Sequence, residues 1–118
     1  MDKLLIPFLF LSLSAYAIRI DYLGNDGNLL VTWEIPTTYE NGDQLPFNNI
    51  GGYALFWSDQ PDGEGVRINI DKHLTQYTLT NVPEGDNYFA MLTYDQNGTD
   101  GNLSDVVYYN FDINQISA

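Results

Sequence analysis

From residue 18 onward, apolar residues alternate with polar ones at every second position, and turn-forming residues interrupt the alternation at roughly regular intervals. No stretch keeps the repeat of about 3.6 residues that an amphipathic helix requires. The alternation predicts seven short strands, at residues 18–22, 29–34, 53–57, 66–70, 77–79, 88–94 and 104–111. Short strands at this spacing favour an all-β fold in which antiparallel strands form a β-sandwich.

The first 17 residues have the layout of an export signal. Lys3 gives a basic start, an apolar run covers residues 4–13, and the small residues Ala15 and Ala17 stand where a signal peptidase cleaves. This run is shorter than the ~20 residues that a membrane-spanning helix needs. We therefore expect a signal peptide at 1–17, cleavage near Ala17, one domain at 18–112 and a tail at 113–118. The mature protein is expected to be secreted or periplasmic and not an integral membrane protein.

Charge and composition exclude several function classes. The chain has 16 acidic and 4 basic residues and a formal net charge of -12, whereas nucleic-acid binding requires clustered Lys and Arg. It has no Cys and a single His, which excludes disulfides, thiolate chemistry and any site that needs two imidazoles. A net charge far from zero keeps a domain soluble, so we expect a monomer.

Three motifs resemble those of fibronectin type III domains. Residues 29–36 (LLVTWEIP) resemble the second strand of that family, with its pattern L-x-V-x-W-x-x-P, and residues 50–57 (IGGYALFW) resemble the third strand. Residues 79–94 (LTNVPEGDNYFAMLTY) resemble the segment that carries the tyrosine corner, except that Pro83 stands one residue early and Glu84 takes its usual place. The resemblance covers about 19–111. It implies a seven-stranded, immunoglobulin-like sandwich of fibronectin type III topology, acting as a non-catalytic binding or spacer module.

The alternation and the resemblance predict the same buried scaffold. Its expected members are Val31, Trp33, Tyr53, Leu55, Leu79, Tyr88 and Leu92. The Tyr88 hydroxyl, near the start of a strand, is expected to reach a backbone group upstream and hold the turn. We expect these residues to support the fold and to take no part in chemistry.

Candidate catalytic and metal-binding residues are few. His73 lies in a polar turn, and the chain has no nucleophile motif of the form G-x-S-x-G, so we expect no enzyme, no catalytic residue and no cofactor. The loop at 95–102 begins with Asp95, ends with Asn102 and carries several oxygen atoms of the kind that Ca²⁺ prefers. Asp100, however, stands where an EF-hand requires Gly, and Asp, Asn and Gly are also ordinary turn formers. A plain hairpin loop is the expectation, with calcium binding left open.

The outward face of the sheet is the remaining candidate site. If the third strand points its Tyr and Leu inward, Phe56 points outward, and the same alternation is expected to expose one side of strands six and seven. The predicted interaction surface is an apolar patch of Phe56, Phe89, Met91, Val106 and Tyr108. Such a patch favours docking of another protein or domain. The alternative is a polysaccharide whose sugar rings stack on Phe56 and Tyr108, and a third interpretation is that cross-strand pairs only stabilise the sheet.

Overall fold

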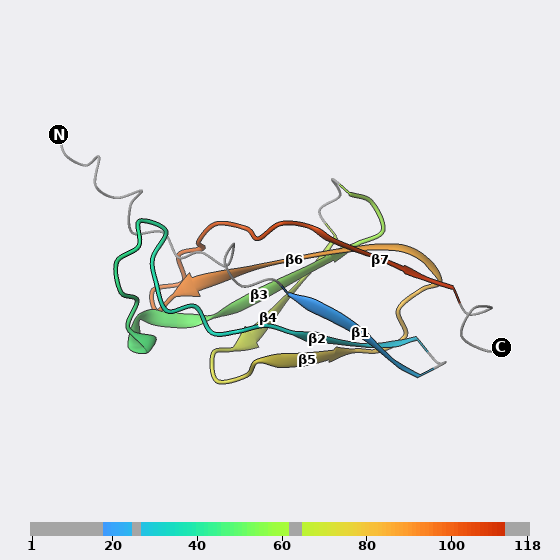
Figure 1. Cartoon of the computed structure of the whole chain (residues 1–118), viewed down its shortest axis with the longest axis horizontal. Coiled ribbons are helices and arrows are strands. Elements are labelled where there is room, and N and C mark those ends of the chain that lie inside the picture. Colours follow the sequence, from blue (N-terminus) through green and yellow to red (C-terminus); the bar gives the residue numbers. More distant parts are fainter. Residues whose placement is uncertain (1–17, 25–26, 62–64, 113–118) are drawn as a thin grey trace.

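The computed structural model describes residues 18–24, 27–61 and 65–112, which form two packed antiparallel sheets (Figure 1). The strands are β1 (Arg19–Gly24), β2 (Asn28–Thr32), β3 (Ile50–Ser58), β4 (Val66–Asp71), β5 (Gln76–Leu79), β6 (Gly85–Asp95) and β7 (Val107–Phe111). A short 3-10 helix, η2 (Phe47–Asn49), precedes β3. The predicted signal peptide at 1–17 and the tail at 113–118 lie outside the described residues.

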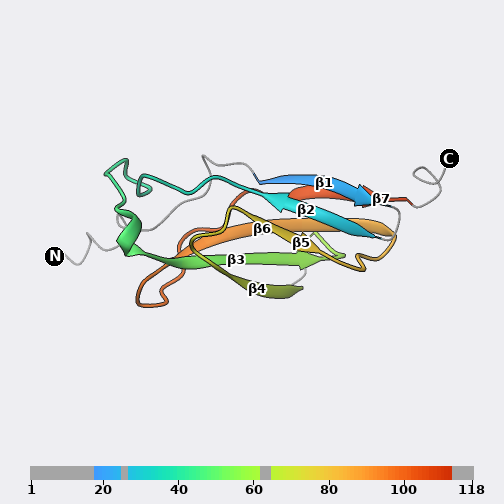
Figure 2. The ribbon, with the colours of Figure 1, turned by 90° about the horizontal axis from the view of Figure 1, so that it is seen from below.

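The two sheets have the orders β1-β2-β5 and β4-β3-β6-β7. In Figure 1, β6 and β7 lie along the upper side of the sandwich and β2 and β5 along the lower side, and Figure 2 looks onto the two overlaid sheets. The predicted all-β, seven-stranded antiparallel sandwich is therefore confirmed for the described part of the chain. Strand β3 is an inner strand of the larger sheet and pairs with β4 along one edge and with β6 along the other.

The core lies between the sheets and is built around an aromatic pair. The rings of Trp33 and Tyr53 meet edge to face at 5.6 Å, and Val31, Leu55 and Leu79 are buried around them as predicted. The Tyr53 hydroxyl donates to the Lys72 carbonyl at 3.1 Å. Burial raises the pKa of Tyr53 to about 12, with a smaller contribution from the nearby Asp71 carboxylate.

The predicted orientation of β6 is wrong. Phe89 and Met91 are 1% and 0% exposed and belong to the core, because they pair with Trp57 and Leu55, the inward residues of β3. Leu92 is buried as expected, but it lies on the other side of the strand, outside the space between the sheets. The physical reason is that both sides of β6 are apolar from residue 88 to 92, so alternation alone does not determine which side faces inward.

The turn before β6 is held by an asparagine rather than by the predicted tyrosine. Asn87 is 1% exposed, and its amide nitrogen donates to the carbonyls of Pro83 at 3.2 Å and Gly85 at 3.1 Å. Its amide oxygen accepts from the Trp57 indole N–H at 2.8 Å. Gly85 has a φ of 112°, which L side chains rarely adopt. Tyr88 lies on the outward side of β6 instead, half-buried.

The last strand begins at Val107, three residues later than predicted. In the segment before it, the Ser104 hydroxyl accepts from the Met91 N–H at 2.9 Å, while the Ser104 and Gly101 N–H groups donate to the carbonyls of Met91 and Thr93. A side chain therefore takes the place of one backbone partner, which interrupts the regular ladder. Residues 101–104 still follow the edge of β6, so this segment becomes part of the outer face of the sheet.

Candidate binding surface

An arginine side chain lies over aromatic rings on one half of the outer face of the β4-β3-β6-β7 sheet. The Arg67 guanidinium on β4 lies 5.5 Å from the centre of the Phe56 ring and 6.0 Å from that of the Tyr94 ring. It donates to both carboxylate oxygens of Asp100, at 2.9 and 3.0 Å. We call these four residues the Arg67 clamp. The clamp links β4, β3 and β6 to the loop that follows β6.

Arg67 and Asp100 each shift the pKa of the other. Hydrogen bonding from Arg67 holds the pKa of the Asp100 carboxyl below its usual range, and the carboxylate raises the pKa of the guanidinium. The Tyr94 ring packs closely on Gly52 of β3. A Cβ atom at Gly52 would lie only 2.7 Å from Cζ of Tyr94, so a larger residue could not be accommodated there without a shift of the ring. Glycine in β3 therefore lets the Tyr94 ring lie against the sheet.

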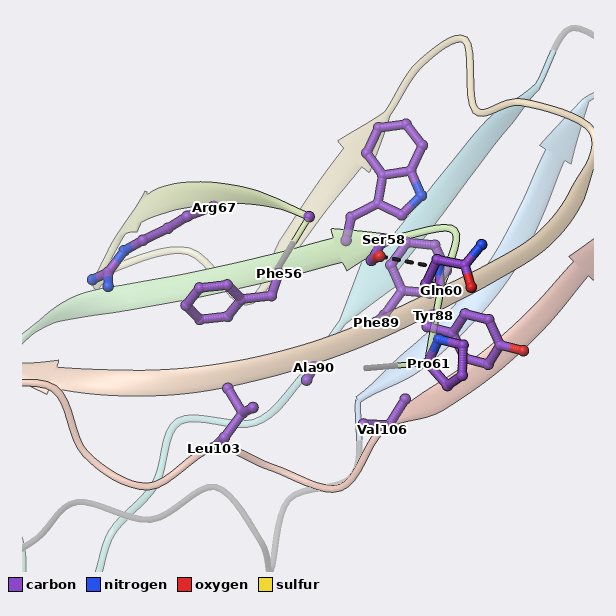
Figure 3. Close-up of a pocket in the computed structure, with 12 residues that line it drawn as sticks. Phe56, Ser58, Gln60, Pro61, Arg67, Tyr88, Phe89, Ala90, Leu103 and Val106 are labelled. Carbon is purple, nitrogen blue, oxygen red and sulfur yellow. Dashed lines mark hydrogen bonds between the residues drawn. The ribbon is translucent and has the colours of Figure 1, made fainter. Parts of the chain in front are cut away.

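The other half of the outer face is open and contains a groove of about 500 Å³. We call it the outer groove. Its lining residues are Phe56, Trp57, Ser58, Gln60, Pro61, Gly65, Arg67, Tyr88, Phe89, Ala90, Leu103 and Val106. Figure 3 shows Ser58 from the end of β3, with Gln60 and Pro61 from the turn after it, on one side, and Leu103 and Val106 from the segment before β7 on the other. The groove is mostly apolar, and Leu103 and Val106 are 52% and 51% exposed.

An aromatic pair and a fixed carboxylate lie next to the groove. The rings of Tyr88 and Tyr108 pack at 5.3 Å with an angle of 43°. The Tyr108 hydroxyl and the Asn110 amide both donate to Oδ1 of Asp86, at 2.7 and 2.9 Å. These hydrogen bonds, that of Asn110 first, keep the pKa of the Asp86 carboxyl below its usual range, and the bond to Asp86 raises the pKa of Tyr108. Asp86 is therefore a constant negative charge at neutral pH.

The structure brings together part of the predicted patch. Phe56 and Val106 line the outer groove, and Tyr108 stands beside it, 55% exposed. The side chains of Phe89 and Met91 are in the core instead, 1% and 0% exposed, so Phe89 borders the groove but exposes almost none of its side chain. Sequence reasoning missed Tyr88 and Ala90 because it assigned the wrong side of β6. It also missed Leu103, because no periodicity identifies an apolar residue within a loop.

The acidic loop at 95–102 is stabilised by its own hydrogen bonds. Oδ1 of Asp95 accepts from the N–H groups of Asn97 at 2.9 Å and Thr99 at 2.8 Å, while Asp100 is engaged by Arg67. Within 18–24, 27–61 and 65–112, no three His, Cys, Asp or Glu side chains gather where they could hold a metal ion. The arrangement is that of an ordinary turn.

His73 also has local partners. Its Nδ1 lies 2.8 Å from the Asp71 carboxylate, and its ring packs edge to face on Phe47 at 5.4 Å. The His73 backbone N–H also donates to the Asp71 carboxylate. This hydrogen bond, followed by the one from the His73 ring, lowers the pKa of the Asp71 carboxyl. The cluster lies at the turn after β4, away from the outer groove. In the described part of the chain, no helix has the length and apolar character needed to cross a membrane.

No protein-family model and no curated protein matches the sequence. Solved structures do match the fold, each over 80% of this chain. The FN1–FN3 domains of chicken CNTN1 superpose with a TM-score of 0.62 at 14% identity, and the match spans 30% of that longer chain. An fn3 domain of human contactin 1 matches with a TM-score of 0.57 at 14% identity over 73% of its length.

A computationally redesigned β-sandwich protein gives a TM-score of 0.54 at 20% identity and is matched over 87% of its length. The described domain thus has the fibronectin type III fold, as the three sequence motifs imply. The outer groove is a mostly apolar surface on this scaffold.

Proposed function

We propose that this chain is an exported, non-catalytic interaction module that binds another protein through the outer groove. The observation that carries the proposal is the concentration of exposed apolar side chains around the groove: Leu103, Val106 and Tyr108 are each more than half exposed. An apolar surface of this kind on a small domain marks a contact region, because leaving it in water is unfavourable.

The outer face of the other sheet is different in character. There, Arg19, Thr32, Gln76 and Thr78 point to solvent, with Leu23 and Leu30 as the apolar exceptions. Because both faces are outward surfaces of the same sandwich, the fold does not require either of them to be apolar. The apolar character of one face supports a role in binding.

Export is the second element of the proposal. It is supported by the basic start, apolar run and small residues of segment 1–17. It also agrees with the lack of Cys, since such a chain has no thiol that a reducing environment must protect.

A protein partner is favoured over a polysaccharide by the state of the aromatic rings. Sugar binding by stacking requires a flat, accessible ring face. Arg67 occupies one side of the Phe56 ring, and the Tyr108 ring is tilted against Tyr88. An irregular apolar groove is better suited to side chains than to the flat face of a sugar.

The test compares two surface variants of the full chain. Val106→Asp places a charge in the outer groove, and Thr78→Asp places the same charge on the outer face of the other sheet. Used as bait in the native secretion fraction, the unmodified chain and Thr78→Asp are expected to retain the same protein, while Val106→Asp loses at least roughly tenfold in affinity for it, measured by calorimetry. Equal retention by both variants, or retention of the chain on soluble polysaccharides, would refute the proposal.

A further inference from the structure

Resting on the proposed function, we infer that the partner presents one apolar side chain to the outer groove and Lys or Arg side chains on both sides of it. The apolar part of this inference follows from the groove lining. The expectation of Lys or Arg on the partner follows from the carboxylates at the rim of the groove. It also follows from the described cations of this chain, which have other partners.

Three exposed carboxylates lie next to residues that line the groove. Asp59 is exposed between Ser58 and Gln60, which line the groove from the turn after β3. Asp105 is exposed next to Val106 on the opposite side. Asp86 precedes Tyr88 by two positions, on the same face of β6, and is held by Tyr108 and Asn110. Negatively charged residues thus flank the segments that line the apolar floor.

No described cation is available to neutralise this rim. Arg67, which borders the groove, is already bound to Asp100 through two hydrogen bonds. Arg19 lies on the outer face of the other sheet next to Asp21. Lys72 and His73 pack on Phe47 beyond the other end of β4. The electrostatic potential over the groove is therefore negative, and a partner with basic groups at the rim is complementary to it.

This charge also argues against a second copy as the occupant. A copy would bring the same acidic rim and a formal net charge of -12 against an identical charge, and like charges that face each other across an interface are destabilising. An acidic or neutral apolar segment would leave the three carboxylates without an opposite charge. A segment of a partner protein with an apolar anchor flanked by Lys or Arg satisfies both the floor and the rim.

Three synthetic peptides of equal length test this inference on the full chain labelled with ¹⁵N. The first has a Leu-Trp-Leu centre flanked by Lys, the second has Glu in place of each Lys, and the third has Ser in place of the apolar centre. Only the first is expected to bind measurably and to shift the amide signals of Ser58, Tyr88 and Val106. Its Kd is expected to rise at least roughly tenfold when the salt concentration rises tenfold. Equal binding of the Glu peptide, or shifts confined to other regions, would overturn the inference.

Charge-neutral variants provide the matched control. Combining Asp59→Asn with Asp105→Asn is expected to weaken binding of the Lys peptide several-fold, while Glu34→Gln, which removes an exposed charge elsewhere, leaves it unchanged. The two proposals fail differently. If Val106→Asp abolishes capture of the native partner but the double variant and high salt do not affect it, the groove is a docking site and the basic partner is wrong. If Val106→Asp leaves capture of the native partner unchanged, the proposed function itself is wrong.

Discussion

Strands β2 and β6 are both inner strands of their sheets, yet their side chains are buried in different patterns. In β2, buried and half-buried residues alternate, so that Leu29 and Val31 face the core and Leu30 and Thr32 face outward. In β6, every residue from Phe89 to Thr93 is buried. The inward side of β6 packs in the core, and its outward side is covered by the Arg67 clamp and the segment at 101–104.

The outer faces of the two sheets therefore differ in how much of them is covered by other parts of the chain. The outer face of the β1-β2-β5 sheet meets water directly, whereas half of the outer face of the larger sheet is closed by its own side chains and the other half is left as an apolar groove. A strand buried on both faces indicates that something lies on its outer side. For Leu92 this is the chain itself, and for the outer groove, which Ala90 lines, we propose a partner.

The largest expected effect comes from the inward side of β6. Phe89→Ala removes a fully buried ring and leaves a cavity, so we expect a loss of about 3–4 kcal/mol in the free energy of unfolding. Tyr88→Ala, on the half-buried outward side, is expected to cost about 1 kcal/mol, chiefly through its contact with Tyr108. Urea denaturation followed by Trp fluorescence measures both. The opposite order of the two losses would mean that β6 points its side chains as the sequence predicted.

The next comparison places the same substitution on the outward sides of β6 and β2. Leu92 is 6% exposed, so Leu92→Ala is expected to cost about 2–3 kcal/mol. Leu30 is only half-buried, and Leu30→Ala is expected to cost about 1 kcal/mol or less. Both are measured by the same urea denaturation. Equal losses would show that the outer faces of the two sheets are covered to the same degree.

Asn87 tests how β6 is joined to the turn before it. Asn87→Ala removes two hydrogen bonds to backbone carbonyls and leaves the Trp57 indole N–H without its acceptor, so we expect a loss of about 2 kcal/mol. Asn48→Ala, at an exposed position of η2, is expected to change the free energy of unfolding by about 0.5 kcal/mol or less. Thermal unfolding followed by circular dichroism compares the two. A loss no larger than that of Asn48→Ala would exclude this role for Asn87.

The smallest expected effect concerns the Arg67 clamp. Both side chains of its ion pair are more than a third exposed, 38% for Arg67 and 41% for Asp100, so Arg67→Met is expected to cost less than about 1 kcal/mol at neutral pH. Because the folded-state pKa of Asp100 is lowered, this stabilisation is present above the usual Asp pKa of about 3.9 and is lost as the pH falls through the lower folded-state value. The stability difference between the unmodified chain and Arg67→Met should therefore shrink in acid.

The control for the clamp is on the other sheet. Arg19 also lies beside a carboxylate, that of Asp21, but its side chain is 76% exposed and contacts no aromatic ring among the described residues. We expect Arg19→Met to have no measurable effect at any pH in the same urea series. An equal loss from both substitutions would mean that the aromatic rings beneath Arg67 contribute nothing.

The fold was predictable because most strands are buried on one face only. Alternation identified Val31, Tyr53 and Leu55 as core residues, and the Trp of the motif at residues 29–36 identified Trp33. The same reasoning failed at Phe89 and Met91, since both sides of their strand are apolar. The outer groove was predicted in part, through Phe56 and Val106, because its remaining wall comes from turns and from a loop, where side-chain direction has no period.

The amino-acid sequence by itself determined the class of fold, since period-two alternation and turn residues are local properties that neighbouring positions impose on one another. It also determined the acidity of the surface and the scarcity of cations. Only the tertiary structure decided which side of β6 enters the core, which residue holds the turn before it, and where an apolar groove meets an acidic rim. These depend on pairing between segments that are distant along the chain, and no local pattern contains that information.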